Sequence, residues 1–312
     1  MSPPPVLLRT LPLVAAAVTV LLWASAFVGI RAVGHELSPG ALALGRMLVG
    51  SVTLTVIVLA VRARRGRPVH RPSPGLLGAV ALWGAAWFGL YNLALNAAEQ
   101  HLDAGTTALL VNVAPVVVAV LAGLLLGEGF PVRLLVGMGI AFGGVVLIAA
   151  TTSAGGADVS GVLLGLVAAL VYAGAAVAQK RLLTRIDALR VTWLGALAGT
   201  AALLPFLPAL LSELGTATTA AVTGTVYLGV FPTAIAFLTW GYALSRTSAG
   251  RLAASTYAVP PIVVLLSWAL LGEFPALLAL AGGALCLLGV AVATRRTRQA
   301  PTGSVGRPIP AA

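Results

Sequence analysis

Long apolar segments, separated by short polar connections, constrain the fold of this chain more than any other feature. Charged residues make up only 9% of the chain, whereas roughly a quarter of the residues in a soluble domain are charged. A helix needs about 20 apolar residues to cross the hydrocarbon core of a bilayer. Ten segments meet this length, at 13–32, 40–61, 76–98, 104–126, 133–151, 160–181, 190–211, 220–244, 251–271 and 276–294. The sequence therefore predicts an all-α polytopic membrane protein with ten transmembrane helices in a lipid bilayer.

The basic residues predict which face of the membrane each connection occupies. If the N-terminus lies in the cytoplasm, all but two of the 19 basic residues fall in inner segments; the exceptions are Arg31 and Arg46. Cytoplasmic connections of membrane proteins carry such an excess of Lys and Arg. We therefore expect both termini to be cytoplasmic. The net charge of +11 does not predict a nucleic-acid partner, because the basic residues form short clusters between apolar runs.

Both ends of the chain are polar and rich in proline. We expect residues 1–12 to form a cytoplasmic segment and residues 295–312 to form a disordered cytoplasmic tail. Arg9, the apolar run from Leu11 and the ASA at 24–26 also resemble a cleavable signal peptide, whose removal would leave nine spans. A counterpart of the first span later in the chain favours a retained helix.

The second half of the chain repeats the first. A shift of 145 residues places Pro115 on Pro260 and the Leu-Leu-Gly-Glu string at 125–128 on the same string at 270–273; a shift of 149 pairs Trp23 more loosely with Tyr172. We expect two five-helix units at 13–151 and 160–294. Because five is odd, the second unit enters the membrane inverted. Inverted repeats are typical of secondary transporters, which expose a midplane site to each side in turn.

Several strings resemble the EamA family of the drug/metabolite transporter superfamily. They are Trp23-Ala-Ser25-Ala-Phe27, the pair Pro39 and Arg46, LNAAEQHLDAGTTALLVNVAPVVVAVLAGLLLGE and YLGVFPTAIAFLTWGYALSRTSAGRLAASTYAVPPIVVLLSWALLGE. The resemblance covers about residues 13–294 and includes two EamA units. It implies a carrier of the inner membrane, usually an exporter of amino acids, related metabolites or toxic small molecules.

Pro115, Pro260 and Pro261 lie in the middle of the fourth and ninth expected spans. A proline inside a helix removes a backbone donor and clashes with the carbonyl four residues earlier. In lipid, each freed carbonyl must find another partner. The three prolines therefore predict helix breaks that either present backbone polarity to a substrate or improve packing through a kink.

Polar and aromatic residues deep within the expected spans are candidates for substrate binding. Asn112 and its repeat partner Tyr257 precede the prolines by three residues, and an amide in hydrocarbon is costly unless it is bonded. We expect such residues to line a pocket for a neutral or zwitterionic molecule with an apolar part; helix-to-helix bonding and ordinary packing are the alternatives. The candidates are Trp23, Ser25, Tyr91, Asn92, Asn96, Asn112, Tyr172, Phe231, Thr233, Trp240 and Tyr257.

Three charged residues are candidates for gating or coupling. Arg46 is the basic residue furthest inside a span, where it could bind a substrate carboxylate, gate the site or pair with Glu36, Glu99 or Asp103. No acidic residue lies at mid-membrane, so coupling is either absent or uses residues at the span ends such as Glu99 and Glu128. The simpler role of Glu128 is to shape the loop before Pro131.

The remaining residues predict neither an enzyme nor a cofactor. The sequence has no deep carboxylate pair, no deep histidine and no HExxH or GxSxG string, which an intramembrane enzyme would need. Its single cysteine excludes a disulfide framework and a cysteine-based metal site. We expect an alternating-access exporter of a small amphipathic metabolite; the alternative is a channel or a membrane subunit that does not transport. The sequence does not indicate an oligomeric state.

Overall fold

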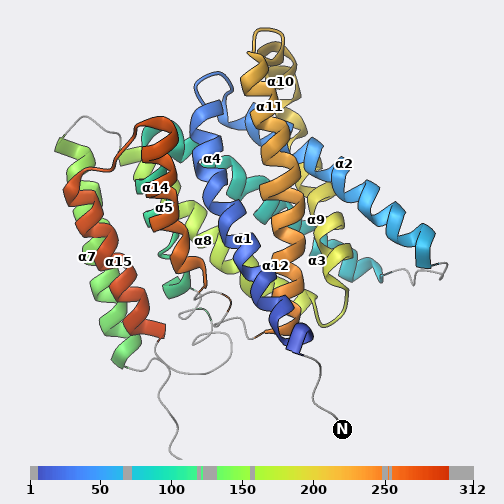
Figure 1. The fold of residues 1–312 in the computed structure, drawn as a ribbon, viewed down its shortest axis with the longest axis horizontal. Coiled ribbons are helices and arrows are strands. Elements are labelled where there is room, and N and C mark those ends of the chain that lie inside the picture. The colour runs from blue at the N-terminus through green and yellow to red at the C-terminus, as the bar shows by residue number, and fades with distance from the viewer. Residues whose placement is uncertain are drawn as a thin grey trace, which may run out of the picture.

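The described part of the chain is helical and contains no strand. The computed structural model describes residues 6–65, 72–117, 121, 132–154, 159–247, 252 and 255–294. Figure 1 shows the helices packed side by side as one bundle, with the chain reversing direction at the two ends of that bundle.

Six helical segments are long and apolar enough to cross a membrane, with 24 to 28 residues each. They coincide with the first three expected spans and with the sixth, seventh and eighth. Three of them are single helices: α1 (Val6–Val33), α2 (Pro39–Arg65) and α8 (Val159–Leu182). The other three contain a short π or 3-10 turn: α3 (Pro74–Gly84), η1 (Ala85–Leu90) and α4 (Tyr91–His101); α9 (Ala188–Leu203), η2 (Leu204–Phe206) and α10 (Leu207–Leu214); α11 (Thr219–Leu228), η3 (Gly229–Ile235) and α12 (Ala236–Arg246).

Four shorter apolar helices coincide with the other four expected spans. They belong to α5 (Ala104–Val111), α7 (Val132–Ala154), η4 (Thr256–Ala258) followed by α14 (Val259–Leu271), and α15 (Leu277–Thr294). The fourth and ninth spans are short in part because the chain breaks next to their prolines.

The break in the fourth span falls just before its proline. α5 ends at Val111, Asn112 and Val113 form a turn, and helical geometry resumes at Ala114, next to Pro115. In the ninth span, the 3-10 turn η4 precedes Pro260 and Pro261, which occupy the first turn of α14. Proline suits a first helical turn, because the N–H that it lacks would have no helical partner there. The carbonyls of Val111 and Thr256 thus lie at the two breaks.

Short polar side chains fix where several helices begin. Asp103 Oδ1 accepts a hydrogen bond from the Thr106 N–H at 2.8 Å, which caps α5. Ser73, Asp187 and Thr218 cap α3, α9 and α11 in the same way. Such caps satisfy backbone donors that the first turn of a helix leaves free.

The outer surface of the bundle carries many large apolar side chains. Examples are Leu82, Phe142, Leu170, Leu265 and Trp268, each more than half exposed. A soluble monomer rarely exposes apolar patches of this extent, because their contact with water is unfavourable. Together with six helices of spanning length, this surface defines a multi-pass membrane protein.

Helices of the first half pack mainly against helices of the second half. α1 contacts α12 and α14, and α8 contacts α4 and α5 in a similar arrangement. α7 and α15 form a pair at one edge of the bundle (Figure 1). Their backbones touch: a Cβ atom on Gly144 would lie 2.4 Å from the Gly282 carbonyl oxygen, so glycine is required there.

Candidate substrate-binding site

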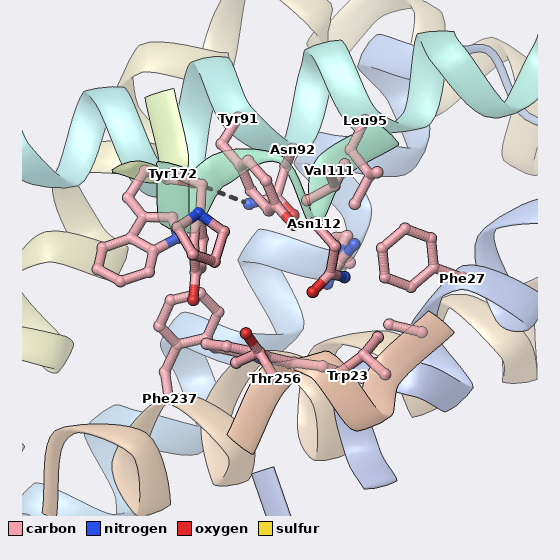
Figure 2. A pocket seen from close by; sticks show the side chains of 15 residues that line it. Trp23, Phe27, Tyr91, Asn92, Leu95, Val111, Asn112, Tyr172, Phe237 and Thr256 are labelled. Carbon is pink, nitrogen blue, oxygen red and sulfur yellow. Dashed lines mark hydrogen bonds between the residues drawn. The ribbon is translucent and has the colours of Figure 1, made fainter. Parts of the chain in front are cut away.

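A cavity lies in the core of the bundle, between segments from both halves of the chain (Figure 2). The cavity volume is about 40 Å³, which is room for only a few water molecules. The cavity is lined by Trp23, Ala26, Phe27, Arg46, Trp87, Tyr91, Asn92, Leu95, Val111, Asn112, Pro115, Tyr172, Phe237, Thr256 and Val259.

Aromatic rings form one wall of this cavity. Trp23 of α1 meets Phe237 of α12 and Tyr172 of α8 edge to face, with ring centroids 5.4 and 6.1 Å apart. Trp87 of η1 meets the same two rings at 5.3 and 5.7 Å, again edge to face. Edge-to-face contacts are the favoured geometry of aromatic pairs. Because each ring fixes its neighbours, the wall is rigid and apolar, and it suits an apolar part of a bound molecule.

The π-helix η1 sets the direction of Trp87 and Tyr91. A π-turn widens the helix and disturbs its regular backbone hydrogen bonds. The side-chain amide of Asn92 donates to the carbonyls of Phe88 at 2.9 Å and Trp87 at 3.3 Å. Asn92 therefore stabilises the turn in which Trp87 lies, in addition to lining the cavity itself.

A second π-helix, η3, lies behind Arg46. It contains Pro232, which has no N–H to donate to the carbonyl of Leu228. The Thr233 hydroxyl donates to that carbonyl at 2.8 Å and accepts from Arg46 Nη2 at 3.1 Å and Nε at 3.3 Å. Thr233 is fully buried and thus anchors one edge of the Arg46 guanidinium.

Arg46 lines the cavity from α2 and is only 3% exposed. Its Nη1 has no hydrogen-bond partner among the described residues, and it makes no ion pair with any of them. The alternative in which Arg46 pairs with an acid therefore does not occur among the described residues. Glu36 accepts from Thr218, Asp103 accepts from Thr106, and the Glu99 carboxylate makes no hydrogen bond to Arg46. A buried guanidinium N–H without an acceptor is costly, so this group is available to a ligand.

Asn112 presents a hydrogen-bond acceptor to the same cavity. Its Nδ2 donates to the Ala108 carbonyl at 3.1 Å, while its Oδ1 is buried and has no partner in the described chain. A carbonyl oxygen can only accept, so the amide nitrogen must face Ala108 and the oxygen must face away from it. In Figure 2 this oxygen points toward the open centre of the cavity.

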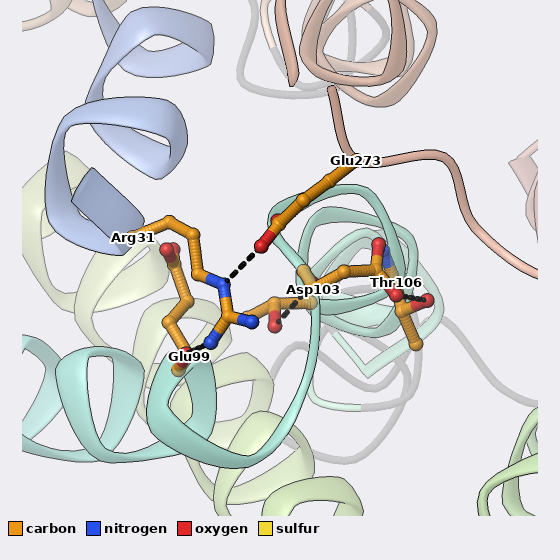
Figure 3. A network of polar contacts seen from close by, with 6 residues as sticks. Arg31, Glu99, Asp103, Thr106 and Glu273 are labelled. Atoms are coloured by element: carbon orange, nitrogen blue, oxygen red, sulfur yellow. Dashed lines mark hydrogen bonds and ion pairs between the residues drawn. The ribbon is translucent and has the colours of Figure 1, made fainter. Parts of the chain in front are cut away.

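A charged cluster lies at the end of the bundle where α1 and α4 finish (Figure 3). Arg31 Nε lies 2.8 Å from Glu273 Oε1, and Arg31 Nη1 donates to the Glu99 backbone carbonyl at 2.7 Å. Glu273 lies between α14 and α15, so the ion pair joins the two halves of the chain. The Glu99 carboxylate is 2% exposed, and neither of its oxygens has a partner among the described residues.

The structure gathers seven of the sequence-predicted residues at the cavity. They are Trp23, Arg46, Tyr91, Asn92, Asn112, Pro115 and Tyr172. Thr233 and Trp240 lie directly behind the lining: Thr233 holds Arg46, and Trp240 packs on Trp23 with centroids 4.9 Å apart.

The other predicted residues lie elsewhere. The Ser25 hydroxyl is 2.6 Å from the Tyr227 hydroxyl, Phe231 stacks on Tyr227 and is 43% exposed, and Asn96 Nδ2 donates to the Pro39 carbonyl. Tyr257 packs against the buried cluster of Val116 and Ala141. Pro260 and Pro261 border a separate apolar pocket beside α15. Glu99 lies in the charged cluster, and Glu128 lies outside the described residues.

The sequence-predicted candidates did not include the lining residues Ala26, Phe27, Trp87, Leu95, Val111, Phe237, Thr256 and Val259. Trp87 is four residues before Tyr91, and this helical spacing was a usable signal. The aliphatic residues Leu95, Val111 and Val259 carry no such signal, because they are indistinguishable from lipid-facing residues in a chain this apolar.

The fold and the cavity together define a class: a helical, multi-pass membrane protein with a central cavity that has an aromatic wall. The family model described as the EamA-like transporter family matches residues 10–150 and again residues 159–295. The chain therefore belongs to the EamA-like transporter family.

Proteins similar in sequence to this chain are also named as transporters. A probable terminal-alkyne amino-acid exporter of Streptantibioticus cattleyicolor is 39% identical over 91% of this chain and 93% of its own length. The uncharacterized transporter YdfC of Bacillus subtilis is 35% identical over 86% of both chains. A solved crystal structure, 19% identical, has a TM-score of 0.59 over 90% of this chain and 96% of that one; it supports the likeness of fold alone.

Proposed function

We propose that this protein is a secondary carrier that exports a small amphipathic metabolite, an amino acid or a related or toxic compound, by alternating access. The observation that carries the proposal is the central cavity, whose rigid aromatic wall and few polar groups come from both family-matched segments. Such a combination suits a small ligand with an apolar part and a polar head. The name of the S. cattleyicolor relative supports an amino-acid-like substrate.

We further propose ten transmembrane helices in two inverted units, 13–151 and 160–294, with both termini on the cytoplasmic side of the inner membrane. Equivalent contacts recur in support of this arrangement. Arg31 donates to the Glu99 carbonyl, and Lys180 donates to the Leu244 carbonyl at 2.7 Å; these pairs are related by the shifts of 149 and 145 residues. The π-helices η1 and η3 also lie at equivalent places.

The narrow cavity fits one step of an alternating cycle. A molecule larger than a few waters cannot enter about 40 Å³ unless helices separate. The Arg31–Glu273 ion pair holds the two halves together at one end, so opening at that end requires the pair to break. The bundle is thus closed at the end that carries this cluster.

Counterflow in proteoliposomes tests the proposal. Vesicles are loaded with unlabelled L-leucine, L-phenylalanine or L-propargylglycine, and uptake of the labelled compound is measured with and without a proton gradient. A carrier shows trans-stimulated uptake. Conductance without trans-stimulation would instead support a channel, and the absence of both would leave a subunit that does not transport.

A matched pair of tryptophan variants locates the site. Trp23→Ala removes a ring from the cavity wall and should reduce counterflow about tenfold or more, because an aromatic side chain contributes most of the contact area. Trp268→Ala removes a lipid-facing ring that is 62% exposed and should leave counterflow unchanged. Equal effects of the two changes would remove the cavity from the proposal.

A further inference from the structure

Several residues that line the cavity have a buried polar atom without a hydrogen-bond partner in the described chain, and these atoms indicate the chemistry of a ligand. Arg46 Nη1 offers an N–H donor with a positive charge, Trp87 Nε1 offers a neutral donor, and Asn112 Oδ1 offers a neutral acceptor. Arg46 and Asn112 are each more than nine-tenths buried, and both line the same small space. The cost of a buried polar group without a partner is large, so a ligand that pairs with Arg46 and Asn112 removes two penalties at once.

The Arg46 guanidinium is oriented before any ligand arrives. Its Nε and Nη2 edge is held by the Thr233 hydroxyl, which is itself fixed on the Leu228 carbonyl. Nη1 remains free. A guanidinium binds a carboxylate through charge-assisted hydrogen bonds, and no acidic side chain is among the residues that line the cavity.

Asn112 is oriented as firmly. Because Nδ2 is committed to the Ala108 carbonyl, Oδ1 can serve only as an acceptor and selects a ligand with N–H donors. The faces of the neighbouring aromatic rings, Trp23 and Tyr172 among them, favour a cation as well. A carboxylate on Arg46 and an ammonium near Asn112 are the two ends of an α-amino acid.

We propose that Arg46 and Asn112 select a zwitterion: Arg46 Nη1 binds the substrate carboxylate, Asn112 Oδ1 accepts from the substrate ammonium, and the aromatic wall holds an apolar side chain. This assignment rests on the proposed function and narrows its substrate class to amino acids with both groups free. Amines without a carboxylate and acids without an amine are then poor substrates.

Derivatives of three amino acids test the assignment in the wild-type protein. Counterflow is measured with L-leucine, L-phenylalanine and L-propargylglycine, and with the amide and the N-acetyl derivative of each. The amide lacks the carboxylate, and the N-acetyl derivative lacks the ammonium. We expect each derivative to be transported about 10- to 100-fold less efficiently than its parent, the loss that a charged hydrogen bond brings.

Variants identify the residue responsible for each preference. Arg46→Gln should remove the preference for the acid over the amide, whereas Asn112→Ala should remove the preference over the N-acetyl derivative. Arg62→Gln is the matched control: Arg62 is on the same helix, but its guanidinium lies over the Trp193 ring at 5.3 Å, outside the cavity. It should keep both preferences.

The outcomes separate this inference from the proposed function. Trans-stimulated uptake with equal rates for parents and derivatives would overturn the zwitterion site and leave the carrier intact. Absence of trans-stimulation for every parent and derivative would overturn both. The comparison of compounds uses only the wild-type protein, so it decides the question even where Arg46→Gln does not fold.

Discussion

At the scale of single residues, one buried hydroxyl connects the backbone to the cavity. Thr233 satisfies the Leu228 carbonyl left by Pro232 and at the same time anchors Arg46. Its role is therefore double: it stabilises a π-turn and it positions a guanidinium. Only the second role should appear in transport kinetics.

Replacement of Thr233 by valine, which has nearly the same shape, tests both roles. We expect the free energy of unfolding to fall by about 1–3 kcal/mol, since the buried Leu228 carbonyl loses a donor. The KM for the transported amino acid should rise, because Arg46 loses its anchor. Thermal unfolding in detergent and counterflow measure the two effects.

A threonine on α2 provides the control for this change. The Thr53 hydroxyl donates only to the Val49 carbonyl of its own helix at 2.8 Å. That carbonyl keeps its helical bond, so Thr53→Val should change neither stability nor KM appreciably. If Thr233→Val resembled Thr53→Val in KM, Arg46 would not depend on Thr233 for its position.

The polar character of deep residues predicted part of the candidate site. The remaining lining residues depend on how each helix is rotated about its axis. Asn112, Tyr91 and Tyr172 were predicted because polar groups deep in an apolar span need a reason to be there, and they line the cavity. Asn96 was also a predicted pocket residue, yet its Nδ2 donates to the Pro39 carbonyl. The sequence indicates a span but not its rotation about its own axis, and the π-turns of η1 and η3 alter that rotation.

At the scale of helices, breaks in the helical geometry of two spans position residues of the site. Asn112 lies in the turn after α5, and Thr256 lies in the 3-10 turn before α14. The prolines predicted both breaks from sequence, because a missing N–H is independent of context. Which polar side chain points into the cavity at each break depends on how the neighbouring helices pack. That packing could not be predicted from the sequence.

The Arg31–Glu273 pair joins α1 to the segment between α14 and α15, and its removal should loosen that end. A reporter cysteine at Ala26, which lines the cavity, is introduced in a Cys286→Ala background, since Cys286 is the only natural cysteine. Arg31→Gln should then raise the rate of labelling by an impermeant maleimide from that end. We expect about two- to fivefold, since the pair is partly exposed and such pairs contribute little.

The ion pair between Arg190 and Asp187, at the start of α9, serves as the comparison. Arg190 and Asp187 are three residues apart, 3.2 Å between Nε and Oδ2, and both belong to the start of α9. Arg190→Gln should leave the labelling rate of the reporter unchanged. An unchanged rate in Arg31→Gln as well would mean that the pair does not hold that end closed.

A second contact between helices predicts a pH dependence. The Glu36 carboxylate accepts hydrogen bonds from the Thr218 N–H and hydroxyl, both at 2.7 Å. These bonds, the backbone one above all, lower the pKa of Glu36 below its ordinary value. A carboxylate whose pKa is lower in the folded state stabilises that state above its unfolded pKa, and this contribution disappears as pH falls through the folded pKa.

We therefore expect the stability difference between wild type and Glu36→Gln to be present at neutral pH and to shrink as the solution is acidified below the ordinary range of a glutamate. Thermal unfolding in detergent, measured for both proteins across that range, gives the difference directly. A difference that stays constant with pH would show that the carboxylate charge contributes nothing to the contact between the α1–α2 connection and α11.

At the scale of the whole molecule, composition and repetition predicted more than any local pattern. The apolar spans and scarce charges predicted an all-helical membrane protein, and the resemblance to the EamA family is confirmed by the match over both halves. The sequence did not predict that α7 packs against α15. Glycines in a membrane span indicate a close helix contact but not which helix makes it.

The last prediction follows from the proposed inverted arrangement of the two halves. If each unit contains five spans, the connection after Glu128 and the connection after Glu273 open on opposite faces of the membrane. Single cysteines at Gly129 and Phe274, each in a Cys286→Ala background, should react with an impermeant maleimide from the cytoplasmic and the outer face respectively. Reaction of both from one face would give the units the same orientation, and a cavity shared by two inverted units could then no longer be opened to each side by their rocking.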